Sequence, residues 1–394
     1  MTIIPNLKRR HFLIGTAGVV TSAATGLPAL AEGDATALPD YVSWKNADAV
    51  IVHTKETLET QRAAQGAELL TPSNSLYVRN NLPAPSDEIV ADRDAWEIEF
   101  GGVANPTSMT LGQLKTMGIE TVVCVLQCSG NGRAFFDHEA SGTQWGVGAA
   151  GNVAWTGVPV RTVIEAMGGA GDDLPWLTGT GGEVIPEGIP AETIQVERSV
   201  PAEVMDRAIL AWEMNGEPIP LAHGGPLRLI VPGYYGVNNV KYVKKLAFTA
   251  EESSAKIQQS GYRIRPVGEK GAPSQPSMFE MNVKSWITGP LTDAATGKVQ
   301  IHGVALGGVS AVSKIEVSID GGETWTEASF IGPDLGEYAW RPFVLGVDLP
   351  AGDHVLASRA TNAAGDTQPE TVEPNERAYG HNGWRAHAVT VTVA

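Results

Sequence analysis

The sequence predicts an α+β protein of two domains, a mixed domain of strands, short helices and loops followed by an all-β domain. The chain has 394 residues, enough for two hydrophobic cores. Its 45 glycines and 25 prolines favour a structure rich in loops and strands. Glycine, proline and serine are concentrated at residues 268–277, which predicts the linker between the two domains.

The N-terminal segment has the pattern of an export signal. Two arginines, Arg9 and Arg10, precede a mild apolar run, and Ala29–Ala31 provides a small-x-small cleavage site. Paired arginines indicate the twin-arginine route, which exports proteins already folded around a cofactor. We therefore expect residues 1–31 to be removed, which would leave a periplasmic protein with no membrane anchor. An uncleaved anchor is the alternative, but the run contains many Gly, Ala, Ser and Thr residues.

Residues 32–72 are expected to lead into a first domain at 73–270. One helix is predicted at 57–70, because this stretch is rich in Glu, Gln and Ala. A short strand at 76–78 then delivers Arg79 into a loop. Trp96–Phe100 alternates between apolar and acidic residues, which predicts a half-buried strand.

A buried strand is predicted just before Cys128, because residues 120–127 contain a β-branched, apolar run. Beyond it lies a Gly-rich loop that ends at Arg133, and reactive groups often lie on such loops. The other cysteine, Cys124, is separated from Cys128 by four residues of strand, about 13 Å. A disulfide needs about 4.4–6.8 Å. We expect Cys124 to be a small buried hydrophobe, whereas Cys128 is either structural or a reactive thiolate.

Two further patterns in the first domain concern phosphate-containing ligands. Gly146–Gly151 matches the G-x-G-x-x-G pattern of dinucleotide sites, but glycine and proline soon interrupt the helix that such a site requires. His223, Arg228 and Lys241 lie around the apolar strand 229–231. Each of these three would be unremarkable alone, as a surface or core residue; a phosphate dianion buried in protein would need cationic donors of this kind.

Residues 273–394 predict the all-β domain. Lys314–Ile319 alternates in polarity, and Asp320–Gly322 is a hairpin signal. Further strands are predicted at 299–304, 343–347, 354–361 and 386–393. This spacing is typical of an immunoglobulin-like sandwich of about 120 residues, here without a disulfide.

Several separated blocks, taken in order, resemble the sulfite oxidase family. The blocks are 77–85, Cys128–Arg133, 223–228, 231–233, 240–242, Tyr262 and Trp340–Arg341. The resemblance extends from about residue 47 to the C-terminus. It implies a molybdenum–molybdopterin cofactor, with Cys128 and the two sulfurs of the pterin dithiolene as soft ligands of the metal. No Cys-x-x-Cys-His motif and no flavin module occur in the sequence, so neither haem nor flavin is expected.

The resemblance also implies roles for individual residues. Arg79 and Arg341 would bind an oxyanion substrate, and Tyr262 would donate a hydrogen bond to it. The implied cofactor-binding residues are Asn80, Asn81, Arg133, Trp145, His223, Arg228 and Lys241, of which the last three would hold the phosphate. The chain departs from the family twice: Asn81 replaces a His found in many relatives, and Gly132 replaces an Arg common in eukaryotic relatives, which makes the pocket less basic.

The function that the resemblance implies is oxidation of sulfite to sulfate, with water as the oxygen source. Two electrons would pass to a separate acceptor, such as a c-type cytochrome, and the C-terminal domain would form a homodimer. The net charge of −16 argues against nucleic acid as a partner and favours a basic acceptor. The alternatives are the molybdenum subunit of a sulfane dehydrogenase and, in a different class, an exported Ig-like binding module. A nitrate reductase is less expected, because its usual haem and flavin modules are missing.

Overall fold

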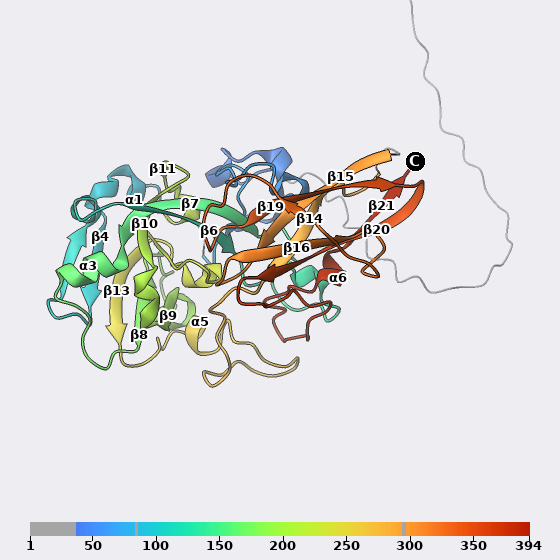
Figure 1. Cartoon of the computed structure of the whole chain (residues 1–394). Helices are drawn as coiled ribbons and strands as arrows, with labels where there is room; N and C mark the ends of the chain where they lie inside the picture. Colours follow the sequence, from blue (N-terminus) through green and yellow to red (C-terminus); the bar gives the residue numbers. More distant parts are fainter. Residues whose placement is uncertain (1–36, 83–85, 294–296) are drawn as a thin grey trace, which may run out of the picture. The chain divides into compact units, whose positions relative to one another are not determined.

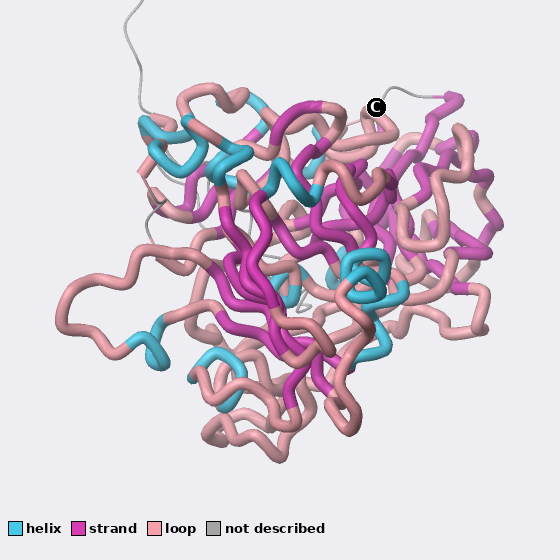
Figure 2. Tube along the Cα trace, turned by 90° about the vertical axis from the view of Figure 1, so that its left-hand side faces the viewer, coloured by secondary structure: helices cyan, strands magenta, loops and turns pink. Residues whose placement is uncertain are grey.

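The structure is a computed structural model that describes residues 37–82, 86–293 and 297–394. The predicted export signal therefore lies outside the described residues. Figure 2 shows strands, in magenta, at the centre of the fold and long loops projecting from them. Within the described ranges, no helix is long and apolar enough to cross a membrane.

In the described residues, three sheets form the N-terminal part. The first contains β1 (Val50–Thr54), β2 (Thr57–Thr60) and β3 (Val78–Arg79). The second has the order β11-β10-β7-β6 with β12 beside β10, and its strands are β6 (Glu120–Gln127), β7 (Ala150–Pro159), β10 (Ile209–Met214), β11 (Glu217–Pro218) and β12 (Arg228–Ile230). The third has the order β5-β4-β13-β8-β9, and its strands are β4 (Glu97–Gly101), β5 (Thr107–Thr110), β8 (Trp176–Gly181), β9 (Glu197–Pro201) and β13 (Val243–Thr249).

Short helices connect these strands, and one large core joins the second and third sheets. The helices are α1 (Glu88–Ala91), α2 (Leu111–Leu114), α3 (Val160–Ala166), α4 (Ala191–Ile194) and α5 (Lys256–Gln259). Val158 and Leu210 of the second sheet belong to the same buried cluster as Leu177 and Leu246 of the third. The predicted alternating strand is confirmed as β4, in which the apolar side chains are buried and the two glutamates are exposed.

The predicted helix at 57–70 is wrong. Residues 57–60 form β2, which pairs with β1, and only a single 3-10 turn, Arg62–Ala64, follows. All four residues of β2 are buried, including Glu59. The Glu59 carboxylate accepts a hydrogen bond from the Gly148 backbone amide at 2.8 Å and lies 2.7 Å from Nε2 of His53. The two β-branched threonines of this strand and its burial on both faces therefore outweigh the helix formers that follow it.

The C-terminal part is a β-sandwich of two four-stranded sheets, as predicted. One sheet has the order β14-β15-β19-β18, with β14 (Lys284–Gly289), β15 (Gly297–Leu306), β18 (Ser329–Phe330) and β19 (Arg341–Leu349). The other has the order β17-β16-β20-β21, with β16 (Val312–Ser318), β17 (Thr326–Glu327), β20 (Gly352–Asn362) and β21 (Val389–Val393), while α6 (Trp384–His387) precedes β21. The predicted hairpin is confirmed, because β16 and β17 pair antiparallel around Gly321 and Gly322, both with positive φ.

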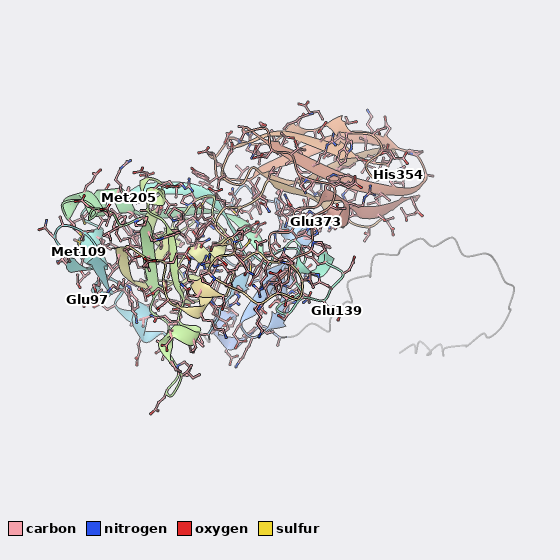
Figure 3. All side chains as sticks on the ribbon, turned by 90° about the horizontal axis from the view of Figure 1, so that it is seen from below. Glu97, Met109, Glu139, Met205, His354 and Glu373 are labelled. Carbon is pink, nitrogen blue, oxygen red and sulfur yellow. The ribbon has the colours of Figure 1, made fainter. Side chains whose placement is uncertain are left out.

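The β-sandwich contacts the N-terminal part through strand β14 and through its loops. In Figure 1 the strands of the sandwich, orange to red, form one group beside β6 and β7. The amide of Val125 in β6 donates to the carbonyl of Tyr338 at 2.9 Å. The loop between β20 and α6 also reaches the junction, where Figure 3 labels Glu373. The end of the predicted linker pairs with the segment that precedes it, because the amide of Ile264 donates to the carbonyl of Pro276. The domain boundaries at 270 and 273 stay a prediction.

Candidate active site

Cys128 lies immediately beyond the end of β6, in a tight turn against β7. Its amide donates to the Ala149 carbonyl at 2.9 Å, and its carbonyl accepts from the Asn131 amide at 3.0 Å. Gly132 has φ +94°, and a Cβ there would lie 2.8 Å from Cβ of His381. The turn therefore requires glycine at 132, which accounts for the absence of a second arginine beside Arg133.

Cys124 and Cys128 are both free thiols in different surroundings. Cys124 is buried within β6, in a cluster that includes Trp155 and Ile230. Burial raises the pKa of the Cys124 thiol to about 12, so it is unsuited to act as a thiolate. Cys128 is only partly buried and lines a pocket. The structure thus separates the two cysteines as the sequence predicts.

Most of the predicted site residues line one pocket, which we call the inner pocket. Its predicted members are Arg79, Asn80, Asn81, Cys128, His223, Arg228, Lys241 and Tyr262. These residues come from β3, the turn after β6, the loops around β12 and the loop after α5, so the fold brings together segments that are far apart in the chain. Tyr77, Ser129, Glu183 and Tyr242 also line the pocket.

One end of the inner pocket is cationic. Arg228 is fully buried, and its guanidinium donates to the carbonyls of His223, at 2.8 Å, and of Asn239, at 3.1 Å. The Lys241 ammonium donates to Oδ1 of Asn80 at 2.5 Å and to the Ala222 carbonyl at 2.7 Å. None of the charged groups at this end forms an ion pair with a carboxylate of the described chain.

The electrostatics of this end indicate an anionic ligand. Burial lowers the pKa of Lys241 well below its usual value, and the charge of Arg228 adds to this. Burial also lowers the pKa of Arg228 to about 10. The nearby carboxyl is Glu183, and burial raises its pKa to about 7, so it offsets little positive charge. Cations in such a position need a negative partner, and a phosphate dianion would supply it.

The inner pocket also presents polar atoms that lack protein partners. Among the described residues, nothing hydrogen-bonds to Nη1 of Arg79, Nδ2 of Asn80 or Oγ of Ser129, although each atom is buried. An unsatisfied buried donor costs about 1–3 kcal/mol, and a ligand would remove this cost. Tyr262 stacks on Tyr379 with ring centroids 5.2 Å apart and an interplanar angle of 7°.

A second, wider cavity continues from the Cys128 end, and we call it the outer cavity. It shares Arg79, Cys128 and Tyr262 with the inner pocket. Two predicted cofactor-binding residues, Arg133 and Trp145, line the outer cavity instead of the inner pocket. The Arg133 guanidinium donates to the carbonyls of Thr143, at 2.7 Å, and of Arg377, at 3.1 Å. Arg133 therefore connects the Cys128 turn to the loop between β20 and α6.

The structure does not place Arg341 in the site. Its guanidinium pairs with Asp334 at 3.0 Å and lies over the ring of Phe330 at 4.9 Å. Arg341 lines neither the inner pocket nor the outer cavity. The prediction that it encloses the substrate is therefore wrong. Arg341 is the first residue of β19, and its guanidinium packs over the ring of Phe330 in β18.

Arg377 is the C-terminal cation that the sequence reasoning missed. It lines the outer cavity beside Tyr379, and the centre of its guanidinium lies 5.9 Å from the Tyr379 ring. Its Nε has no hydrogen-bond partner in the described part of the chain. The local sequence 374–379 has no periodicity or motif that marks this arginine. Its position follows from the packing of this loop against Arg133.

Comparisons with known proteins match both parts of the chain. Residues 83–257 match the family model described as the oxidoreductase molybdopterin binding domain, and residues 275–393 match the Mo-co oxidoreductase dimerisation domain. The chain is 30% identical to the sulfite oxidase of Gallus gallus over 338 residues, 80% of this chain and 72% of that protein. The chain belongs to the sulfite oxidase family. Mitochondrial sulfite oxidase of Macaca fascicularis is 33% identical over 350 residues, but the match spans only 62% of its length.

One solved structure of this type resembles the chain over nearly its whole length. The sulfane dehydrogenase SoxCD from Paracoccus pantotrophus matches with a TM-score of 0.73 and 25% sequence identity, covering 96% of each chain. Relatives named for two different sulfur substrates thus share this architecture.

The residues of the inner pocket fit the cofactor that the family binds. The cationic end suits a phosphate, the unpartnered atoms of Arg79, Asn80 and Ser129 suit a polar ring system, and Cys128 offers a soft thiolate. In the described ranges, no group of three or more His, Cys, Asp or Glu side chains could hold a metal ion. A metal at Cys128 would therefore take further ligands from a bound group, such as a pterin dithiolene.

Proposed function

We propose that this protein is a molybdenum enzyme that oxidises sulfite to sulfate, with water as the oxygen source. The observation that carries the proposal is the inner pocket, which a free cysteine lines where the pocket meets the outer cavity and which His223, Arg228 and Lys241 line away from that cavity. Molybdopterin carries its metal and its phosphate at opposite ends. Membership of the sulfite oxidase family supports the same assignment.

Bound molybdenum would supply the two-electron oxidation and the transfer of oxygen. Cys128 would hold the metal through its thiolate, and the phosphate would be held by the cationic end. Arg79 would bind the substrate anion: although burial opposes its charge, Tyr262 and Cys128 raise the pKa of Arg79 above its usual value. Arg377 would provide the second cation from the outer cavity. Tyr262 would donate a hydrogen bond to an oxygen of the substrate, held in place by its stacking on Tyr379.

A sulfane dehydrogenase is the second candidate. The full-length similarity to SoxCD favours it, and so does the outer cavity, which is wide enough to admit more than a small anion. A sulfane substrate is a sulfur chain attached to a carrier protein, so its carrier would have to enter through the outer cavity. Arg265, Lys256 and Lys270 also line this cavity and would contact an acidic carrier.

We further propose a periplasmic location, reached by the twin-arginine route, and a homodimer formed through the dimerisation domain. The electrons would pass to a separate basic acceptor, such as a c-type cytochrome. The net charge of −16 supports this partner, because an acidic surface steers a basic protein at low ionic strength.

The deciding experiment measures metal content and turnover on the same purified protein. We expect about one molybdenum and one pterin per chain, together with sulfite oxidation coupled to ferricyanide or a basic cytochrome c. A protein that contains the cofactor but oxidises only a persulfide-loaded carrier would be a sulfane dehydrogenase. A protein without molybdenum and pterin would be a binding module, and the proposal would be wrong.

A further inference from the structure

Lys45 lies against the cationic end of the inner pocket, although no motif marks it in the sequence. Its side chain is only 5% exposed. The ammonium lies 2.7 Å from the carbonyl of Ser73, 2.5 Å from the carbonyl of Leu76 and 2.8 Å from Nε2 of His223. Lys45 and His223 are 178 residues apart in the chain, so this contact exists only in the folded protein.

The number of protons on each group fixes which partner donates in each of these contacts. A lysine ammonium has three protons and accepts nothing, and here it faces three acceptors. Nε2 of His223 then accepts, so the proton of the neutral ring is on Nδ1. The ring is neutral because burial, together with the charges of Lys45, Lys241 and Arg228, lowers the pKa of His223 well below its usual value. His223 lines the inner pocket, and on this assignment its Nδ1–H is the ring proton that a ligand there could accept.

We propose that Lys45 is a positioning residue of the phosphate site: it holds His223 as the Nδ1–H tautomer, which donates to the cofactor phosphate, and it adds a positive charge behind the ring. The inference rests on the proposed function, because the ligand is the phosphate of molybdopterin. It extends the phosphate site from the three residues in the pocket to one outside it.

The energetics favour this role over a purely structural one, in which Lys45 only bridges two backbone carbonyls. None of the three hydrogen-bond partners of Lys45 is a carboxylate, and its ammonium otherwise lies over the Trp44 ring at 4.6 Å. A buried ammonium without a counter-charge is costly. Burial lowers the pKa of Lys45 well below its usual value, which expresses this cost. A side chain that only bridged the carbonyls of Ser73 and Leu76 would need hydrogen-bond donors but no charge. A phosphate dianion on the far side of His223 would provide the missing negative charge.

The first test observes the tautomer in the intact holoenzyme. The chain has eight histidines, so selective 15N-histidine labelling gives few ring signals, and His223→Ala identifies the signal of His223. We expect a neutral ring protonated on Nδ1 in the wild type. In Lys45→Met this signal should shift toward the Nε2-protonated form, whereas Lys55→Met, at a side chain that is 77% exposed, should leave it unchanged. A wild-type His223 protonated on Nε2 would overturn the inference.

The second test measures how tightly the cofactor is held. Molybdenum and pterin are assayed during dialysis of wild type, Lys45→Met, Lys55→Met, His223→Ala and the double variant Lys45→Met/His223→Ala. We expect Lys45→Met to speed the joint release of both about ten-fold, and to have a smaller effect once His223 is absent, when only the charge of Lys45 still acts. Lys45→Gln retains hydrogen-bond donors but carries no charge. Faster release from this variant as well would therefore be due to the lost charge and not to misfolding.

The outcomes distinguish the inference from the proposed function. Release from Lys45→Met at the rate of Lys55→Met would overturn the inference alone. The inference would also be overturned if Lys45→Met sped cofactor release as much in the His223→Ala background as in the wild type, because Lys45 would then act independently of the ring. Wild-type protein that contains no pterin would instead refute the proposed function, and the inference with it.

Discussion

Replacing Arg377 with Met tests whether the C-terminal β-domain contributes a substrate-binding cation. The guanidinium of Arg377 lines the outer cavity together with Cys128 and Arg79, and its Nε has no protein partner within the described residues. Methionine keeps much of the aliphatic length of the side chain and removes the guanidinium that lies 5.9 Å from the Tyr379 ring, so the loss of packing is small.

The expected magnitude follows from the loss of one charge-assisted hydrogen bond. Such a contact to an anion is worth about 1.5–3 kcal/mol. Because each 1.36 kcal/mol changes a rate or binding constant about ten-fold, kcat/KM for sulfite should fall roughly ten- to a hundred-fold. Most of the change should be in KM, because the lost group binds the anion in the ground state as well.

Arg341→Met is the matched control, since it removes an arginine from the same domain. Its pairing partner Asp334 is 62% exposed, so losing this ion pair should cost less than about 1 kcal/mol of stability and leave sulfite kinetics unchanged. The assay is steady-state sulfite oxidation, normalised to molybdenum content. A fully metallated Arg377→Met protein with wild-type KM, or a raised KM in Arg341→Met, would refute the placement of these two arginines.

Three further predictions concern the metal, a buried lysine and export. Cys128→Ser should keep the fold and abolish turnover because a hard hydroxyl replaces a soft thiolate; Cys124→Ser should instead cost about 1–3 kcal/mol of stability, and equal activity of both would contradict these roles. Burial lowers the pKa of Lys284 to about 7 in the folded protein. Between about pH 7 and 10.5 this lysine is therefore protonated in the unfolded chain but not in the folded protein, so the free energy of unfolding should rise with pH in this range. In Lys284→Met the melting temperature should rise less with pH over this range. A variant whose melting temperature rises with pH as steeply as that of the wild type would contradict this prediction. Replacing Arg9 and Arg10 by lysine should leave precursor in the cytoplasm, where fractionation would find it.

The Cys128 turn could be predicted because all its signals are local. A β-branched run at 120–127, two glycines and an asparagine within a few residues encode a strand and a tight turn almost independently of the rest of the chain. The same holds for the hairpin at Gly321 and Gly322, where the alternation and the turn residues agree. The sequence by itself thus determined the strand that presents the cysteine and the class of the C-terminal domain.

Only the tertiary structure decided which distant side chains meet. Residues 57–60 begin a stretch rich in helix-forming residues but form β2, because two of the four are β-branched threonines and all four are buried in the sheet. Arg341 and Arg377 both lie in the β-domain, and only the packing of the β20–α6 loop against Arg133 brings the second of them to the outer cavity. Lys45 reaches His223 across 178 residues, a contact that no local pattern encodes because it depends on the closure of the whole fold.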